Sequence, residues 1–435
     1  MNYDACLEFL YSKLPMFSRI GPAALKNDLT NTLKICQFLE NPQTKFKTIH
    51  IAGTNGKGSV SHMLASIFQT AGFKTGLYTS PHLYDFRERI RINGEMISKE
   101  YVTSFTEKII PLIDEIEPSF FEATVGMAFD YFHAENVDIA IIETGLGGRL
   151  DSTNVIRPEL SIITNIGLDH THLLGNTLLE IAGEKAGIIK ERVPVIIGAA
   201  NSITRPLFEK RASELNSKII FSEDVFKSSF SFENRGLISI ELINKENNES
   251  TAYSSDLPGV YQAENIRTVK TAIESLQHMG WKISEEAFTN GVRSAKKNTG
   301  LYGRWDIISY KPMIILDVAH NADGMRMVLS QIKLLKFNKL HFILGLSGDK
   351  DVASLLIQLP IDANYYFTHA SIPRALNAKS LKTSAMEFDL QGDVFENVND
   401  AIENALTKSQ SDDLLIVCGS IFVVSEVDRQ RFLNN

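Results

Sequence analysis

A strand that runs into a glycine-rich turn and then into a helix places the strongest constraint on the fold of this chain. Residues 48–52 have the apolar character of a strand, residues 53–59 read Gly-Thr-Asn-Gly-Lys-Gly-Ser, and residues 60–72 have a helical pattern. In such a turn, backbone N–H groups and the positive end of the helix can hold a phosphate group. Lys57 adds a full positive charge, and Ser59 offers a hydroxyl to Mg²⁺. The segment predicts a phosphate-binding loop, although the extra glycine before the serine departs from the general P-loop pattern and a tight turn without a ligand is the alternative.

Apolar runs and helical periods alternate along the rest of the chain, which is the pattern of an α/β protein. Residues 224–256 interrupt it with a polar, β-like segment that we expect to form a peripheral hairpin. The polar stretch 295–300 has no apolar period and predicts a domain boundary. We therefore expect a P-loop-type, doubly wound, mostly parallel sheet in residues 1–296 and a smaller Rossmann-like α/β domain in residues 297–435. The expected strands are residues 48–52, 75–79, 137–143, 160–165, 193–198, 218–221, 313–316, 341–344, 364–367 and 414–417. The expected helices before the boundary are residues 4–14, 26–39, 60–72, 100–116, 122–135, 178–187, 262–280 and 284–293.

The composition narrows the class of protein. Of the 435 residues, 44% are hydrophobic and 22% are charged, which is typical of a globular chain with a sizeable core. The net charge of −8 disfavours a non-specific nucleic-acid binder but leaves room for a local phosphate site. No apolar run has the length of a membrane helix or of a signal peptide. The three cysteines show no metal-binding spacing and fit a reducing cytosol, so we expect a cytoplasmic protein without a nucleic-acid or membrane partner.

Ionisable residues follow several of the expected strands. Glu143 ends a buried strand, where a carboxylate would point into the ligand crevice of an open sheet and could bind Mg²⁺. His170 follows the next strand and could reach the same crevice, either as a ligand or as a hydrogen-bonding residue. Asp317 and His320 follow a strand of the second domain and are expected to face the crevice between the domains. Lys185 lies on a helix, and by position alone it could be a surface lysine.

Several motifs, taken in order, give the chain a family resemblance. The loop 53–59, with its extra glycine before the serine, looks like the nucleotide loop of the Mur-ligase superfamily, and within it the chain resembles the folylpolyglutamate synthase/dihydrofolate synthase family. Any one motif is weak, but six further motifs in the same order are specific, and they span essentially the whole chain. These motifs are residues 78–83 (Tyr-Thr-Ser-Pro-His-Leu), 143–154, Asp169-His170, 184–187 (Glu-Lys-Ala-Gly), 303–305 (Gly-Arg-Trp) and 317–321 (Asp-Val-Ala-His-Asn).

The resemblance implies an ATP-dependent amide ligase with ATP and Mg²⁺ as cofactors, and it allows a monovalent cation as well. It implies that Lys185 is carbamylated by CO₂, which requires the neutral amine that a semi-buried lysine can supply. The residues implied at the catalytic centre are Lys57, Lys185, Asp317 and His320. Those implied for ATP are Gly53, Thr54, Asn55, Gly56, Lys57, Gly58, Ser59, Asn265, Arg304 and Asp317, and those implied for magnesium are Ser59, Ser80, Glu143 and His170.

The substrates implied by the resemblance are dihydropteroate, reduced folates and L-glutamate, joined through an acyl phosphate in a protein that we expect to be a monomer. Ser119, Phe121 and Asp151 match positions that touch the pterin, since an aromatic ring can stack on it and a carboxylate can accept from its N–H groups. Ser420 matches a position that would help to hold glutamate. From the residues alone, Phe121 could equally be a core aromatic and Arg304 a surface arginine.

Three other classes of protein share parts of this pattern. A cell-wall Mur ligase would need a dedicated domain for its nucleotide-sugar precursor before the phosphate loop, where this chain has a short and mostly helical segment. A nucleotide switch would have no use for the second domain, and the guanine-reading motif Asn-Lys-x-Asp is absent from the sequence. An inactive ligase-like binding module is disfavoured because its expected functional residues are all intact, namely Lys57, Glu143, His170, Lys185 and His320.

Overall fold

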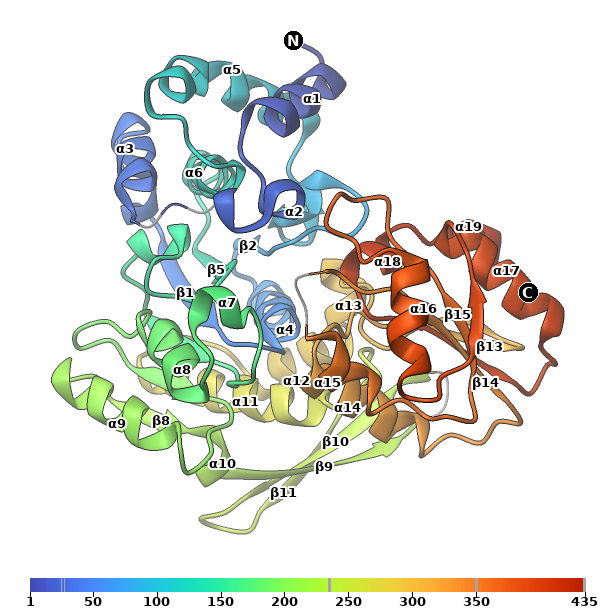
Figure 1. Cartoon of the computed structure of the whole chain (residues 1–435). Helices are drawn as coiled ribbons and strands as arrows, with labels where there is room; N and C mark the ends of the chain where they lie inside the picture. The colour runs from blue at the N-terminus through green and yellow to red at the C-terminus, as the bar shows by residue number, and fades with distance from the viewer. Residues whose placement is uncertain (25, 27, 234–235, 349–350, 433–435) are drawn as a thin grey trace.

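Two α/β domains, one after the other along the chain, make up the protein (Figure 1). The computed structural model describes residues 1–435 except residues 25, 27, 234–235, 349–350 and 433–435. No helix among the described residues combines the length and the apolarity needed to cross a membrane.

The first domain is built on a mixed sheet with the order β4-β3-β2-β5-β1-β6-β7-β8. Its strands from β2 to β8 in that order run parallel, and β3 and β4 add an antiparallel edge. The predicted mostly parallel sheet is therefore confirmed, while the antiparallel edge strands β3 and β4 were not predicted from the sequence. The strands are β1 (Lys47–Ala52), β2 (Thr75–Tyr78), β3 (Ile90–Ile92), β4 (Glu95–Met96), β5 (Ile139–Glu143), β6 (Leu160–Ile163), β7 (Val195–Ile197) and β8 (Ile219–Phe221).

Helices cover both faces of this sheet (Figure 1) because its central strands are apolar on both sides. On one face α4 (Lys57–Thr70) packs with α11 (Gln262–His278) and α12 (Glu285–Arg293). On the other face α5 (Lys99–Ile116) and α6 (Phe120–Ala134) share a core with the N-terminal helices. The remaining helical segments are α1 (Tyr3–Lys13), α2 (Phe17–Ile20), η1 (Gly21–Ala24), α3 (Thr30–Phe38), η2 (Pro42–Thr44), η3 (Phe86–Arg89), η4 (Ser152–Val155), α7 (Thr171–Leu174), α8 (Leu178–Ala186), α9 (Arg205–Glu214) and α10 (Ser222–Val225).

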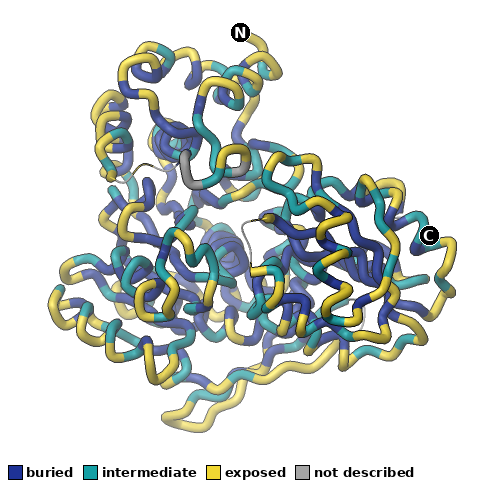
Figure 2. Tube along the Cα trace, in the orientation of Figure 1, coloured by how far each residue is buried: buried dark blue, intermediate teal, exposed yellow. Residues whose placement is uncertain are grey.

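The segment predicted as a peripheral hairpin forms a three-stranded antiparallel sheet, β9 (Phe226–Phe232), β10 (Ile238–Asn244) and β11 (Ser250–Ser255). Alternate residues of β10, such as Ile238 and Ile240, join the core that contains α4 and α11. The opposite face is largely exposed, as Figure 2 shows along the lower edge of the molecule. The alternation of buried and exposed residues explains why the segment has a β pattern and yet looks polar.

Residues 295–299, where the polar composition predicts the domain boundary, form a short helix, α13 (Ala295–Thr299), that packs on α4. Hydrogen bonds, and not an apolar face of the helix, attach α13 to its neighbours. The hydroxyl of Thr299 meets Nδ1 of His62 at 2.8 Å, and the carboxylate of Asp256 accepts from two backbone N–H groups of α13. Such contacts leave no hydrophobic period in the sequence.

The second domain is a mixed sheet with the order β12-β13-β17-β14-β15-β16, in which only β12 runs antiparallel to its neighbour. The four predicted strands are present, and the short edge strands β12 and β16 were missed. The strands are β12 (Asp306–Tyr310), β13 (Met313–Leu316), β14 (Leu340–Leu344), β15 (Asn364–Phe367), β16 (Gly392–Val394) and β17 (Leu414–Cys418). The helices are α14 (Ala322–Ile332), α15 (Val352–Leu356), α16 (Ala378–Met386), α17 (Val398–Lys408), α18 (Ile421–Ser425) and α19 (Arg429–Phe432).

Candidate active site

The loop between β1 and α4 has the backbone shape of an anion-binding turn. Gly53 and Gly56 have φ values of 151° and 85°, which side chains rarely adopt. A Cβ at Gly56 would lie 2.4 Å from Oδ1 of Asn265, so the predicted nucleotide residue Asn265 packs directly on the loop. α4 begins at Lys57 without a side-chain cap, which leaves the N–H groups of its first turn facing the loop. This geometry fits the predicted phosphate site.

The loop after β6 holds the phosphate loop from one side. Asn165 Oδ1 accepts from the backbone N–H of Asn55 at 2.9 Å, and the hydroxyl of Thr164 donates to the carbonyl oxygen of Asn55 at 2.6 Å. The hydroxyl of Thr54 donates to the carbonyl of Gly167 and accepts from its N–H. The sequence reading missed these supporting residues, because nothing local in the sequence connects the two loops.

Two side chains of the phosphate loop make contacts that bear on its predicted role. Nζ of Lys57 donates to the carbonyl oxygens of Gly53 and Thr54, so the ammonium group lies folded over the loop. The buried hydroxyl of Ser59 accepts from Gln262 Nε2 at 3.2 Å, and Asn265 donates to Oε1 of the same glutamine. Polar side chains of α11 thus pack against the start of α4. Gln262, which makes these bonds, was not among the predicted site residues.

Glu143 ends β5 beside the phosphate loop, as predicted. Its side chain is 4% exposed, and burial raises its pKa, while the Lys57 ammonium and the backbone N–H of Ser80 act in the opposite direction. Ser80 makes this contact through its backbone, N to Oε2 at 3.1 Å. The other carboxylate oxygen, Oε1, faces Gly58, 3.8 Å from where a Cβ would stand.

The oxygen atoms of Glu143 and Ser59 fit a divalent cation whose remaining ligands are nucleotide phosphates and water. No group of three or more His, Cys, Asp or Glu side chains within the described part of the chain is arranged to hold a metal ion. Mg²⁺ commonly takes one or two protein oxygens and completes its shell with phosphates and water. Glu143 and the hydroxyl of Ser59 are hard oxygen donors of that kind.

His170, the other predicted metal residue in this region, follows the β6 loop. Its ring packs edge-on against Phe17, with ring centres 5.9 Å apart, and its Nε2 lies 3.9 Å from Oδ1 of Asp169.

Lys185 is buried, so the surface-lysine alternative is wrong. It is 3% exposed and its ammonium donates to the carbonyl oxygen of Gly53 at 2.9 Å, beneath the phosphate loop. Burial, together with the nearby Lys57 charge, lowers its pKa to about 7. A substantial neutral fraction at neutral pH follows, which is what carbamylation requires. The position reaches the site because α8 packs under the loop after β5.

Two of the three residues predicted to touch a pterin, Asp151 and Phe121, contact the loop after β5, and the third, Ser119, begins the helix α6 that carries Phe121. Both carboxylate oxygens of Asp151 accept from groups of this loop, including the N–H groups of Gly145 and Leu146 at 2.8 and 2.9 Å. Ser119 caps α6 in a reciprocal arrangement with Glu122. Phe121 is half-buried. A Cβ at Gly145 would lie 2.5 Å from its ring, and its ring centre is 6.1 Å from that of Tyr78. Asp151 therefore also stabilises its own loop, and Ser119 also stabilises the N-terminus of α6.

Arg304 of the second domain approaches the phosphate loop, and Asp317 of the same domain bonds to Tyr261 of the first. The Arg304 guanidinium comes within 3.5 Å of where a Cβ of Gly58 would stand, so the surface-arginine alternative is wrong. Asp317 is 3% exposed and accepts from the hydroxyl of Tyr261 at 2.7 Å and from the N–H of Trp305 at 2.8 Å. Burial raises the pKa of Asp317, and the Tyr261 bond and the Arg304 charge oppose this rise. Tyr261 precedes α11 and was missed, because its relevance depends on a contact between domains.

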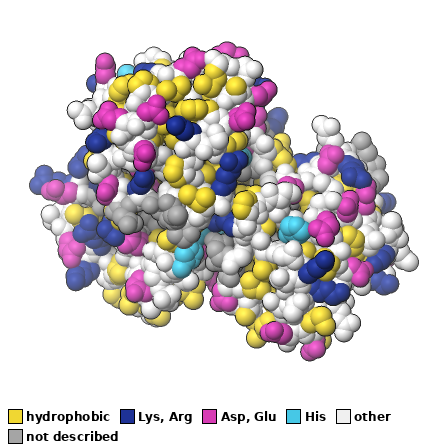
Figure 3. All heavy atoms as spheres, turned by 45° about the horizontal axis from the view of Figure 1, so that its top comes forward, with side chains coloured by type: hydrophobic (Ala, Val, Ile, Leu, Met, Phe, Trp, Pro, Cys, Tyr) yellow, Lys and Arg dark blue, Asp and Glu magenta, His cyan; other side chains and the backbone are white. Residues whose placement is uncertain are grey.

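His320 and Ser420 occupy the ends of second-domain strands, as predicted, but in different settings. Nε2 of His320 lies 3.1 Å from Oδ2 of Asp169 in the first domain, and Nδ1 lies 2.9 Å from the carbonyl oxygen of Val318. Ser420 is buried and caps α18 by accepting from the N–H of Phe422. Figure 3 shows Lys and Arg (dark blue), Asp and Glu (magenta) and His side chains (cyan) interspersed over this face of the molecule.

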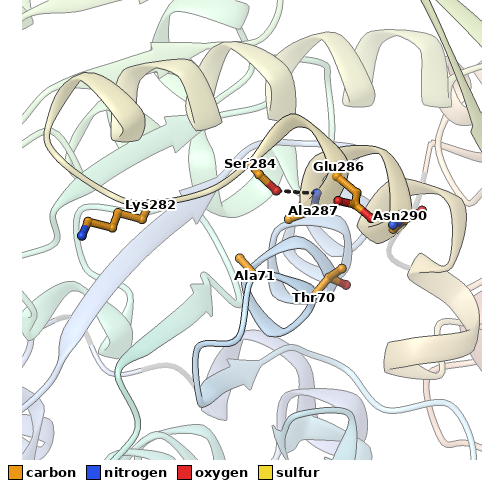
Figure 4. Close-up of a pocket in the computed structure, with 7 residues that line it drawn as sticks. All are labelled: Thr70, Ala71, Lys282, Ser284, Glu286, Ala287 and Asn290. Atoms are coloured by element: carbon orange, nitrogen blue, oxygen red, sulfur yellow. Dashed lines mark hydrogen bonds between the residues drawn. The ribbon is translucent and has the colours of Figure 1, made fainter.

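A separate surface pocket does not belong to this site. It has a volume of about 320 Å³ and lies between the end of α4 and the start of α12 (Figure 4). The phosphate loop is at the opposite end of α4, whose 14 residues span about 20 Å. The pocket is lined by Thr70, Ala71, Lys282, Ser284, Glu286, Ala287 and Asn290.

Fold and site together define an ATP-dependent ligase of the Mur type, with a nucleotide loop in one domain and acidic, basic and histidine side chains presented by a second. The Mur ligase middle domain family matches residues 51–272, and the Mur ligase glutamate ligase domain family matches residues 303–421. The chain belongs to the dihydrofolate synthase/folylpolyglutamate synthase family.

Individual relatives cover nearly the whole chain. The dihydrofolate synthase/folylpolyglutamate synthase of Bacillus subtilis is 32% identical over 93% of this chain and 95% of its own length. The structure of E. coli FolC in complex with DHPP and ADP is 28% identical, covers 99% of both chains and superposes with a TM-score of 0.84. A bifunctional folylpolyglutamate synthase/dihydrofolate synthase with Mn, AMPPNP and L-glutamate bound is 28% identical, covers 98% of this chain and 97% of its own, and gives a TM-score of 0.82.

Proposed function

We propose that this chain joins L-glutamate, in an ATP-dependent reaction, both to dihydropteroate and to reduced folates that already carry glutamate. The observation that carries the proposal is the meeting of two sets of residues. Lys57, Glu143 and Lys185 surround the phosphate loop of the first domain, and Arg304 reaches the same loop from the second. Relatives named for both reactions, and related structures with DHPP or L-glutamate bound, support these substrates.

The first half of the proposed reaction forms an acyl phosphate. ATP lies with its phosphates on the loop 53–59, and an oxygen of the substrate carboxylate attacks the γ-phosphorus while ADP leaves. Lys57, the N-terminus of α4 and Arg304 stabilise the negative charge of the transferring group. A divalent ion held by Glu143 and Ser59, with Ser80 and His170 as further candidates, would supply additional charge neutralisation on the phosphates. A carbamate on Lys185 would add an anion beneath the loop that supports this ion.

The second half transfers the acyl group to glutamate. The α-amine of L-glutamate attacks the acyl carbon, the bond from this carbon to the phosphate oxygen breaks, and phosphate leaves. Asp317 and His320 orient the amine or take up its proton, and Ser420 helps to hold glutamate. Water would destroy the acyl phosphate, so the contact between the domains has to exclude it.

We further propose a cytoplasmic monomer that acts on small molecules, with no nucleic-acid or membrane partner. The buried free thiols of Cys6, Cys36 and Cys418 support a reducing compartment. The net charge of −8 disfavours non-specific nucleic-acid binding. A monovalent cation is a further candidate cofactor.

The deciding experiment supplies dihydropteroate and tetrahydrofolate in parallel with ATP and L-glutamate. Products are identified by mass spectrometry, and ADP is measured in the same samples. The proposal requires one added glutamate with both acceptors. Formation of a glutamylated product from only one of the two acceptors would restrict the function to that acceptor. ATP hydrolysis at the same rate with and without an acceptor would favour a nucleotide switch. Tight binding of the substrates without ATP hydrolysis would favour an inactive module.

A further inference from the structure

Four side chains from three loops meet where the two domains touch. Asn55 comes from the phosphate loop, Asp169 from the loop between β6 and α7, and His320 and Asn321 from the loop between β13 and α14. Oδ2 of Asp169 lies 3.1 Å from His320 Nε2 and 3.1 Å from Asn321 Nδ2. Both second-domain residues are thus attached to one oxygen of the first domain.

Asn321 also forms a reciprocal amide pair with the phosphate loop. Asn55 Nδ2 donates to Asn321 Oδ1 at 3.2 Å, and Asn321 Nδ2 donates to Asn55 Oδ1 at 3.1 Å. The remaining bond of Asn321 Oδ1 is to the N–H of Gly324, 2.8 Å away. With its two donors and two acceptor positions used, the Asn321 amide has a single favourable orientation. It is 7% exposed, so a lost bond would leave a polar group poorly hydrated.

The phosphate-loop end of this pair is itself held in place. The backbone N–H and carbonyl of Asn55 are bonded to the side chains of Asn165 and Thr164, which fixes the place on the loop from which its amide extends. Beside it the domains approach closely, because a Cβ at Gly167 would lie 2.3 Å from Oδ2 of Asp323 in α14. The pair therefore lies where the two domains are packed closely together.

We propose that Asn321 is a positioning residue: its amide pair with Asn55, together with the bonds of Asn321 and His320 to Asp169, holds the His320 loop in a fixed position on the nucleotide loop and keeps water from the acyl phosphate until the amine arrives. The inference rests on the proposed function and names the contacts that couple its two half-reactions. His320 is the neighbour of Asn321 in the chain, so a shift of one moves the other. Nucleotide bound on the loop is thereby linked to the placement of His320 through two side-chain amides.

The competing explanation is that Asn321 serves only as the N-cap of α14. The substitution Asn321→Ser separates the two roles, since serine caps a helix well but is too short to keep both amide bonds to Asn55. Asn397→Ser is the matched control. Asn397 caps α17 in the same domain by accepting from the N–H of Asp400, and its amide donates to the carboxylate of that same residue.

The readout is the number of ADP molecules formed for each glutamate incorporated, measured with saturating ATP and tetrahydrofolate. Wild type and Asn397→Ser are expected to give a ratio near one. Two lost hydrogen bonds weaken the closed arrangement by roughly tenfold or more, so Asn321→Ser is expected to give a ratio above about two, with a raised KM for glutamate. A ratio that stays near one while kcat falls would overturn the proposal, because a purely structural defect lowers the amount of active enzyme without uncoupling it.

Two further variants guard against ambiguity. Asn321→Asp keeps the length and the cap of the side chain but removes both donors, and it is expected to uncouple the reaction even if the serine variant folds poorly. The double variant Asn55→Ala/Asn321→Ser is expected to show no more uncoupling than its more severe single parent, since both changes break the same pair. Additive uncoupling would contradict the pairing. Failure of wild type to form any amide would instead refute the proposed function itself.

Discussion

Replacing Lys185 with methionine should stabilise the protein and abolish ligation. Burial and the neighbouring Lys57 lower the pKa of Lys185 from 10.5 to about 7. Such a shift corresponds to about 5 kcal/mol against the charged form in the folded state. The variant loses the hydrogen bond from Nζ to Gly53, which is worth about 1 kcal/mol. Below pH 7 the net gain in the free energy of unfolding should therefore be about 4 kcal/mol.

The sign of the pH dependence follows from proton uptake. Between pH 7 and 10.5 the unfolded chain binds more protons at this residue than the folded chain, so wild-type stability rises with pH in that window. By pH 9.5 the penalty has shrunk to about 1 kcal/mol, and wild type and Lys185→Met should be about equally stable. The advantage of the variant is thus confined to neutral and acidic solution.

Urea denaturation of both proteins at pH 6.5 and pH 9.5, in CO₂-depleted buffer, measures this difference directly. Lys210→Met, at an exposed position of α9, is the control and should show no such dependence. Added bicarbonate should narrow the gap at neutral pH, because a carbamate consumes the neutral amine only in the folded state. A difference between wild type and Lys185→Met that is the same at both pH values would refute the reasoning about burial.

Three further substitutions test the site. Lys57→Ala should lower ligation by roughly 10²–10³-fold, while thermal unfolding stays close to wild type, because the bonds of the ammonium group are to carbonyls of its own loop. Gly56→Ala should cost about 1–2 kcal/mol in urea denaturation and weaken ATP binding measured by calorimetry, since φ there is 85° and the new Cβ would press on Asn265. Tyr261→Phe removes one donor from the buried Asp317 carboxylate, so stability should fall by about 1–3 kcal/mol and kcat should fall more than KM for ATP changes. Wild-type kcat in that variant would show that the tyrosine does not position the carboxylate.

Local sequence was sufficient wherever a segment carries its own periodicity. The central strands are apolar and rich in β-branched residues, and the glycine-rich turn requires backbone angles that few other residues adopt, so β1, the phosphate loop and α4 could be predicted. Edge strands such as β16, which reads Gly-Asp-Val, and the polar helix α13 could not be predicted. Their hydrogen-bonding partners lie far away in the sequence, as the bond between Thr299 and His62 shows.

The sequence by itself determined the class of the fold, the place of the phosphate loop and the order of the motifs that indicate a folate ligase, because each depends on residues adjacent in the chain. Only the tertiary structure decided that Lys185 is buried under Gly53, that Arg304 reaches the loop from the other domain, and that Tyr261 bonds to Asp317. Burial and charge depend on which segments pack together in space, and packing between segments far apart in the chain leaves no periodic trace in the sequence.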